Sequence, residues 1–127
     1  MVEVSAAIIK KDDKILICQR PKGKNCELLW EFPGGKLESL ETPKDCLIRE
    51  CKEELDVTIE VKRLVQKVEY DYPDTKVLIY FYLCEIKYGN PSCIEHNDIK
   101  WCTINEISNM NLCPADREML NNSKNDI

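Results

Sequence analysis

The order of hydrophobic and polar positions along the chain predicts a series of strands with helices between them. Apolar runs at Val2–Ile9 and Ile15–Cys18 flank the polar turn Lys10–Lys14, so they predict a β-hairpin. Val77–Ile86 is apolar on both of its faces, which places it in the centre of a sheet. Shorter strands are expected at Leu28–Phe32, Val57–Val61, Leu64–Tyr70 and Ile99–Cys102.

Start signals predict three helices. Thr42 can cap a helix and is followed by proline, so a helix is expected over Pro43–Leu55. A second capping pattern begins at Thr103 and predicts a short helix. A last helix is expected over Pro114–Leu120, followed by a frayed tail at residues 121–127. The elements together predict an α/β fold with a mixed central sheet, and helices on both faces would make it an α/β/α sandwich.

The first helix is predicted to carry a ridge of acids. At about 100° per residue, Glu50, Glu53 and Glu54 share an arc of roughly 100°. A core-facing stripe lies beside them and is formed by Leu47, Ile48, Cys51 and Leu55. Carboxylate oxygens suit Mg²⁺, although most glutamate-rich helices are simply solvated faces, so the helix alone leaves both interpretations open.

The preceding Gly34-Gly35 strengthens the metal interpretation. Two glycines are expected to form a turn with unusual dihedral angles and close backbone approach. A carbonyl group from such a turn can act as one more hard oxygen ligand. Glu41 lies just before the helix and can return toward the same ridge.

Composition and charge narrow the classes of function. The chain has 127 residues, of which 43% are hydrophobic and 32% charged, as expected for one globular domain over residues 1–127. The net charge of −5 disfavours nucleic-acid polymers but allows small phosphate esters held through a divalent metal. No apolar run is long enough to span a membrane, and no basic region precedes the N-terminal apolar stretch, so we expect a cytoplasmic protein.

The eight cysteines are expected to be reduced and mostly buried. No two are spaced as C-x-x-C, and His96 is the only histidine, which argues against a zinc site and a thioredoxin-like pair. An even number of cysteines allows disulfides, but a chain of this length without a signal peptide does not need them.

The spacing of the glycine, the glutamates and the arginine resembles the Nudix box. Gly35 is followed after five residues by Glu41 and after seven more by Arg49-Glu50, and Glu53-Glu54 complete the pattern. Cys51 stands where an aliphatic residue is usual. Asp56 stands in place of a late glycine, which costs about 1 kcal/mol if that position has a positive φ. The segment Trp30–Lys36 is similar to the MutT-like branch and to CTP pyrophosphohydrolases.

The resemblance implies a Nudix α/β/α sandwich with the catalytic loop and helix at the edge of its sheet. It implies Mg²⁺ as cofactor, with Mn²⁺ as a substitute, held by the Gly34 carbonyl group and by Glu53 and Glu54. Glu50 is expected to bind a metal and to orient or deprotonate the attacking water. The remaining implied roles are an Arg49 that fixes a box glutamate, support from Gly35 and Glu41, and a further acid, Glu95, that can equally be a surface residue.

Base specificity is expected to lie at Asp116, near the start of the last helix. An ionised aspartate accepts from an exocyclic amine, a protonated one can also donate, and the residue can instead simply favour the helix N-terminus.

The resemblance implies a Mg²⁺-dependent nucleoside triphosphate pyrophosphohydrolase releasing a monophosphate and pyrophosphate, tilted toward pyrimidine or modified bases. The alternatives are an 8-oxo-dGTP diphosphatase that cleans the nucleotide pool and a non-catalytic nucleotide sensor. The expected partner is a small nucleotide, with neither nucleic-acid polymer nor membrane, and the chain is expected to be a monomer or homodimer.

Overall fold

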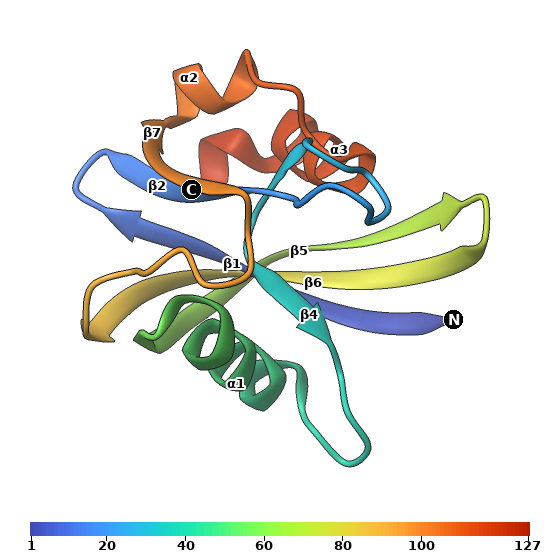
Figure 1. The fold of residues 1–127 in the computed structure, drawn as a ribbon, viewed down its shortest axis with the longest axis horizontal. Helices are drawn as coiled ribbons and strands as arrows, with labels where there is room; N and C mark the ends of the chain where they lie inside the picture. The colour runs from blue at the N-terminus through green and yellow to red at the C-terminus, as the bar shows by residue number, and fades with distance from the viewer.

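A mixed sheet lies between helices on its two sides (Figure 1). The computed structural model describes residues 1–127. Its strands are β1 (Val2–Lys11), β2 (Lys14–Gln19), β3 (Trp30–Glu31), β4 (Gly34–Lys36), β5 (Thr58–Tyr72), β6 (Thr75–Tyr88) and β7 (Asp98–Thr103). Its helices are α1 (Pro43–Leu55), α2 (Ile104–Ser108) and α3 (Pro114–Ser123), with a 3₁₀ turn at Lys124–Asp126.

The sheet consists of two groups of strands joined at the N-terminal hairpin. Strand β1 runs parallel to β6 and antiparallel to β4, and β6 pairs antiparallel with β5. Strand β2 pairs antiparallel with β3 and β7. The predicted hairpin is confirmed, but β1 and β2 pair only at Lys10–Ile15 and Lys11–Lys14. The two strands therefore enter different halves of the sheet.

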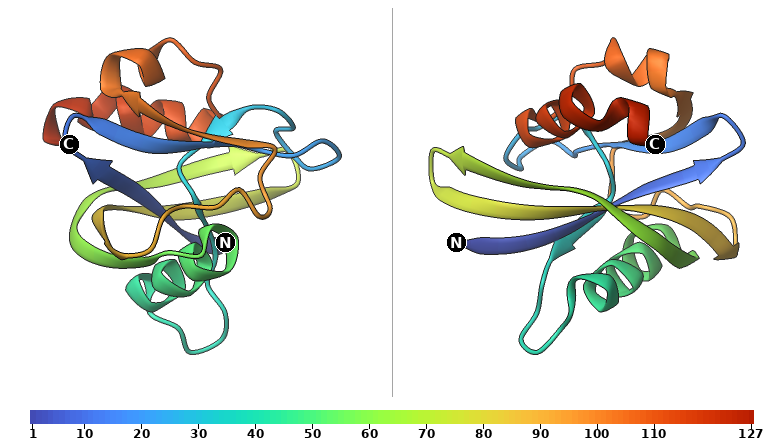
Figure 2. Two further views of the ribbon diagram at one scale, coloured as in Figure 1. Left: turned by 60° about the vertical axis from the view of Figure 1, so that its left-hand side comes forward. Right: turned by 180° about the vertical axis from the view of Figure 1, so that it is seen from behind.

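The α/β/α sandwich is confirmed by two separate cores. Along β1, Ile8 packs toward α2 and α3 while Ala7 and Ile9 pack toward α1. Strand β6 lies between β1 and β5 and contributes Phe81 to one core and Cys84 to the other, which confirms the central strand. Figure 2 shows α1 on one side of the sheet and α2 with α3 on the other. Alternation along the strands therefore feeds both helical layers.

Strand β5 corrects one prediction, because the two expected strands form one continuous strand. Its register against β6 shifts between Val61 and Arg63 and again between Leu64 and Gln66. An unpaired residue at such a bulge interrupts the alternation of apolar positions without ending the pairing. The polar interruption in the sequence therefore marks a bulge instead of a turn.

Helix α1 begins and ends at the predicted residues. The Thr42 side chain accepts a hydrogen bond from the Asp45 backbone N–H at 3.1 Å, and Asp56 ends the helix with φ 55° in the left-handed region. The buried stripe differs from the prediction, because Ile48 is exposed and Cys46 is buried. The sheet therefore covers an arc rotated toward Glu54, which is itself buried.

The expected frayed tail is wrong. Helix α3 continues to Ser123 and the 3₁₀ turn follows it directly. Ser123 is buried and its hydroxyl donates to the Gln66 side chain at 2.8 Å, which ties the helix end to β5.

No helix of the protein is long and apolar enough to cross a membrane. All eight cysteines are free and six of them are buried, as predicted.

Candidate active site

The two glycines before α1 form a strand, so the predicted turn is wrong. Gly34 pairs with Ala6 and Gly35 with Ser5 across the β4–β1 ladder, and neither glycine has a positive φ. The expected close approach is present. A Cβ at Gly34 would collide with the backbone of Ser5, and one at Gly35 would collide with the Glu50 carboxyl group. Glycine is needed here for space, because β4 passes directly between β1 and α1.

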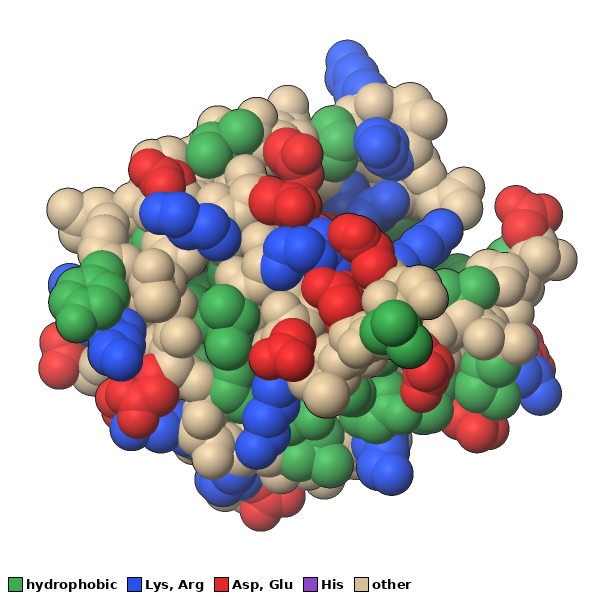
Figure 3. Space-filling view, turned by 90° about the horizontal axis from the view of Figure 1, so that it is seen from below, with side chains coloured by type: hydrophobic (Ala, Val, Ile, Leu, Met, Phe, Trp, Pro, Cys, Tyr) green, Lys and Arg blue, Asp and Glu red, His purple; other side chains and the backbone are tan.

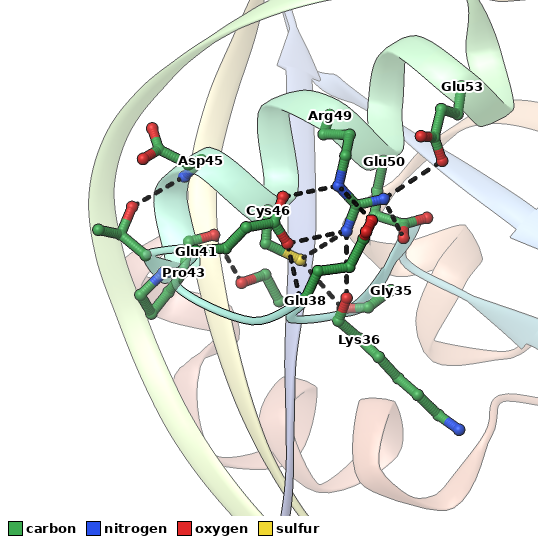
Figure 4. A network of polar contacts seen from close by, with 12 residues as sticks. Gly35, Lys36, Glu38, Glu41, Pro43, Asp45, Cys46, Arg49, Glu50 and Glu53 are labelled. Carbon is green, nitrogen blue, oxygen red and sulfur yellow. Dashed lines mark hydrogen bonds and ion pairs between the residues drawn. The ribbon is translucent and has the colours of Figure 1, made fainter.

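Arg49 donates hydrogen bonds to three glutamates and also lies 3.4 Å from the carboxylate of a fourth, the exposed Glu38 (Figure 4). Its guanidinium donates to Glu41 at 2.6 and 2.9 Å, to Glu50 at 2.9 Å and to Glu53 at 3.2 Å. It also donates to the Lys36 carbonyl oxygen at 3.2 Å. Hydrogen bonding to Arg49 lowers the pKa of Glu41 to about 2. We call this group (Glu41, Arg49, Glu50 and Glu53) the arginine network.

The three acids of the predicted ridge lie in different surroundings. The side chain of Glu53 is 55% exposed and that of Glu50 is 17% exposed, and both are held by Arg49. The side chain of Glu54 is only 9% exposed and has no contact with the arginine. Figure 3 shows acidic and basic side chains close together on the α1 side of the molecule. The acids therefore divide into a neutralised outer pair and one buried carboxylate.

Glu54 is buried without a full set of partners. Its Oε1 atom has no hydrogen-bond partner, and its Oε2 atom lies 3.7 Å from His96 Nε2. Burial, followed by the neighbouring acids Glu50, Glu31 and Glu95, raises the pKa of Glu54 to about 9. Such a group is stabilised either by a proton or by a cation.

A pocket of about 540 Å³ brings many of the predicted residues together. Of the candidate site residues, Gly34, Gly35, Glu54, Glu95 and Asp116 line it. The arginine network does not belong to the lining and lies behind the glycine strand. The structure thus separates residues that face the pocket from residues that hold α1 and β4 in place.

The sequence did not single out several residues of this pocket. Arg20, Lys24 and Lys36 add positive charge to a wall that also carries Glu31 and His96. Arg20 pairs with Glu31 at 3.2 Å. The available signals were an acid between the buried Trp30 and Phe32 and a single histidine next to Glu95. Neither signal shows which distant residues it meets in the fold.

Asp116 lies deep in the same pocket. Its Oδ1 atom accepts a hydrogen bond from the Phe32 backbone N–H at 3.0 Å. Burial raises the pKa of Asp116 to about 8, with the charge of Glu31 as the next cause. The raised pKa favours the protonated form of the carboxyl group near neutral pH, and a protonated carboxyl group has both a donor and an acceptor oxygen.

The acidic side chains of the site are of the chemical type that binds a divalent cation. Carboxylate oxygens are the ligands that Mg²⁺ prefers, and the buried Glu54 Oε1 atom without a partner is open to such a contact. No three acidic, histidine or cysteine side chains converge closely enough to hold a metal ion as they stand. Arg49 accounts for this, because it holds Glu50 and Glu53 toward itself.

Comparison with known proteins agrees with this geometry. The NUDIX domain family model matches residues 1–122. The CTP pyrophosphohydrolase of Escherichia coli (strain K12) is 35% identical over 120 residues, covering 94% of this chain and 89% of that protein. The 8-oxo-dGTP diphosphatase of the same strain is 29% identical over 120 residues, covering 94% of this chain and 93% of that protein.

Solved structures give the same result. The crystal structure of a MutT NUDIX hydrolase from Burkholderia pseudomallei matches with a TM-score of 0.85 and 26% identity, covering 94% of this chain and 95% of that one. The fold is therefore the sandwich of this class of hydrolases. The chain belongs to the Nudix hydrolase family, and its relatives lie in the MutT-like and CTP pyrophosphohydrolase branches.

Proposed function

We propose that this Nudix hydrolase is a Mg²⁺-dependent nucleoside triphosphate pyrophosphohydrolase that releases a nucleoside monophosphate and pyrophosphate. The observation that carries the proposal is Glu54, a buried carboxylate with a free oxygen, in a pocket that also holds three basic side chains. Mixed charge of this kind suits a polyphosphate that arrives with a cation. The names of the relatives, which act on CTP and 8-oxo-dGTP, support the same class of substrate.

The proposed roles combine the resemblance to the Nudix box with the position of each side chain. Glu54, Glu53, Glu50 and the Gly34 carbonyl group would hold the cation, with Glu95 as a further acid on the pocket wall. The chemistry that a bound divalent cation supplies is neutralisation of charge on the phosphate oxygens. Glu50 would orient the attacking water or remove its proton. Arg49 would keep Glu50 and Glu53 at fixed rotamers from behind β4.

Asp116 is the proposed reader of the base. A carboxyl group that is protonated near neutral pH presents a donor beside an acceptor, so it matches a base edge with one acceptor and one amine. Cytosine carries N3 and an exocyclic amine in that arrangement, which favours CTP or dCTP. A protonated aspartate also serves a carbonyl oxygen, so 8-oxo-dGTP is the second candidate, supported by the diphosphatase relative.

A panel of nucleotides tests the proposal. Purified protein is incubated with Mg²⁺ and CTP, dCTP, 8-oxo-dGTP or ATP, and pyrophosphate and monophosphate are measured. We expect equal amounts of both products, greatest turnover with a cytosine nucleotide, and no turnover after chelation of the metal. Tight nucleotide binding without any product would favour the non-catalytic sensor, and release of inorganic phosphate in place of pyrophosphate would contradict the proposed bond cleavage.

Two variants separate the chemistry from the choice of base. Glu53→Gln is expected to lower turnover of every nucleotide to the same degree, since it removes a carboxylate that would bind the cation. Asp116→Asn is expected to change the ratio of rates between CTP and 8-oxo-dGTP by about tenfold or more, within the range of one base contact. An unchanged ratio would remove Asp116 from the proposed base site without affecting the proposed reaction.

A further inference from the structure

His96 has no role in the proposed function, yet its side chain lies between two carboxylates. Its Nε2 atom lies 3.2 Å from Glu31 Oε2 and 3.7 Å from Glu54 Oε2. Its side chain is only 3% exposed. The three groups come from β3, the end of α1 and the loop before β7. The histidine therefore joins segments that are far apart in the sequence.

Glu31 is fixed from its other side. Arg20 donates to both of its carboxylate oxygens, at 3.2 and 3.3 Å. Arg20 in turn donates from Nε to the Asn25 carbonyl oxygen at 2.6 Å. A continuous series of contacts thus runs from the loop after β2 through Arg20, Glu31 and His96 to Glu54.

The backbone around His96 is also fixed. The next residue, Asn97, donates its N–H to the Gln19 carbonyl oxygen at 2.9 Å, and its side chain donates to the Gln19 side chain at 2.7 Å. The His96 carbonyl oxygen accepts from the Cys93 thiol at 3.1 Å. The imidazole is therefore held against β2 by its own segment, independently of the two carboxylates.

The contacts of His96 are not those expected of a residue that serves only the stability of the fold. Its Nδ1 atom is buried and has no hydrogen-bond partner, which is unfavourable for a buried polar group. Its Nε2 atom, in contrast, faces the two carboxylates. It hydrogen-bonds Glu31 and lies at ion-pair distance from Glu54, which is where a residue that orients a metal-binding carboxylate would stand.

We propose that His96 is a positioning residue, which bridges Glu31 and Glu54 and so directs the Glu54 carboxylate into the pocket where a divalent cation binds. The inference rests on the proposed function only in taking Glu54 as a cation ligand. It extends the site to Glu31, which is the histidine's other partner, and to Arg20, which holds Glu31. Neither residue contacts the cation in this arrangement.

Binding of Mn²⁺ to purified protein tests the inference without turnover. The Kd is measured by electron paramagnetic resonance, with and without a CTP analogue whose α,β-bridging oxygen is replaced by methylene. We expect His96→Leu to weaken Mn²⁺ binding about 10- to 100-fold. His96→Gln, whose amide places a donor near the position of Nε2, is expected to restore most of this loss. Ser123→Ala, which also removes a buried polar side chain but lies on the α3 side, is the matched control and should bind Mn²⁺ normally.

Thermal unfolding of each variant separates positioning from folding. We expect His96→Leu to keep a Tm equal to or above that of the parent, because it removes an unpartnered buried nitrogen. Unchanged Mn²⁺ affinity in folded His96→Leu would overturn the inference, and so would a parent protein that binds no Mn²⁺ in either condition. A parent whose Mn²⁺ binding depends on His96 but which releases no pyrophosphate would instead overturn the proposed function alone.

Discussion

The arginine network and the pocket around Glu54 each contain acids of α1, but the fold places these acids in opposite surroundings. Glu50 and Glu53 are bound to Arg49, within 3.2 Å of its guanidinium. Glu54 follows Glu53 directly, yet it is buried against other acids and one of its oxygens has no partner. Arg49 neutralises the charge of the first region, whereas the charge of Glu54 has to be neutralised by a proton or a bound ligand.

The difference shows how a helix can combine rigidity with binding. A guanidinium with several carboxylate partners fixes rotamers and costs little, because its groups stay near solvent. A buried carboxylate without a counter-charge is unfavourable until something neutralises it. In the proposed site, the outer region therefore holds the geometry, and the inner region would supply the driving force for binding a cation.

Replacement of Glu54 has the largest expected effect on activity. Glu54→Gln should lower kcat by about 10²- to 10³-fold, because the cation that neutralises charge on the reacting phosphate group loses one of its proposed carboxylate ligands. The same change should raise the Tm of metal-free protein at pH 8, because the folded protein must keep on Glu54 a proton that the unfolded chain has released, and a neutral amide removes that cost. Exposed Glu118→Gln is the control for the chemical change. A lower Tm together with normal turnover would remove the contrast between the two regions.

Replacement of Arg49 tests the outer region. Arg49→Lys keeps the charge but cannot donate to Glu41, Glu50 and Glu53 together. We expect kcat to fall about 10- to 100-fold, as for other groups that orient a metal ligand. Steady-state kinetics at saturating Mg²⁺ provides the measurement, with exposed Arg63→Lys as the control. If Arg49→Lys retains full activity, the fixed rotamers of the outer acids are not needed.

Asp116 extends the comparison to a second buried carboxyl group through the pH dependence of stability. Its pKa is raised from 3.8 to about 8, so between these values the folded protein keeps a proton that the unfolded chain has released. Asp116 therefore leaves the free energy of unfolding highest below the unfolded pKa. Its contribution is lost as the pH rises through the folded pKa of about 8, at up to about 1.4 kcal/mol per pH unit.

Asp116→Asn should therefore unfold with a weaker dependence on pH than the parent between pH 5 and pH 8, as chemical denaturation at each pH would show. Asp45→Asn is a matched control, because Asp45 also lies in the first turn of a helix but is exposed. Parallel curves for the parent and Asp116→Asn would mean that this carboxyl group is already ionised in the folded protein.

The smallest effect is expected at the exposed end of α1. Lys52 pairs with Asp56 at 2.9 Å, but both side chains are more than 60% exposed. Lys52→Ala should change the free energy of unfolding by less than about 0.5 kcal/mol and leave turnover unchanged. Denaturant titration measures the first and pyrophosphate release the second. A larger effect would show that ion pairs on this helix matter regardless of burial.

Local signals explain what the sequence could predict. The caps of α1 and α2, the central strand β6 and the spacing of Gly35 through Glu54 each depend on residues close together in the chain, and all have the expected structure. Helical angles placed Glu50, Glu53 and Glu54 on one side of α1. They did not show where the sheet would lie, so the burial of Glu54 and the exposure of Ile48 could not be predicted.

Features that depend on distant segments were beyond the sequence. The contact between Glu31 and His96 joins residues of β3 and of the loop before β7. The need for glycine at Gly34 and Gly35 comes from Ser5 and Glu50, which pack against them only in the folded protein. Burial of Asp116 and its hydrogen bond to Phe32 likewise depend on how α3 meets the sheet, so its protonation could be only one of several alternatives.

The parallel pairing of β1 with β6 sets the order in which this protein can be completed on the ribosome. Val2 pairs with Val77 and Ile9 with Cys84, so the first strand to emerge meets this neighbour only after more than half of the chain has been made. Strand β2 waits still longer for β7. An isolated hairpin is marginally stable, and an apolar one with open edges can pair with other chains. Newly made chains therefore pass through a stage in which the apolar strands β1 and β2 still lack partner strands. We expect aggregation to be favoured at this stage of synthesis.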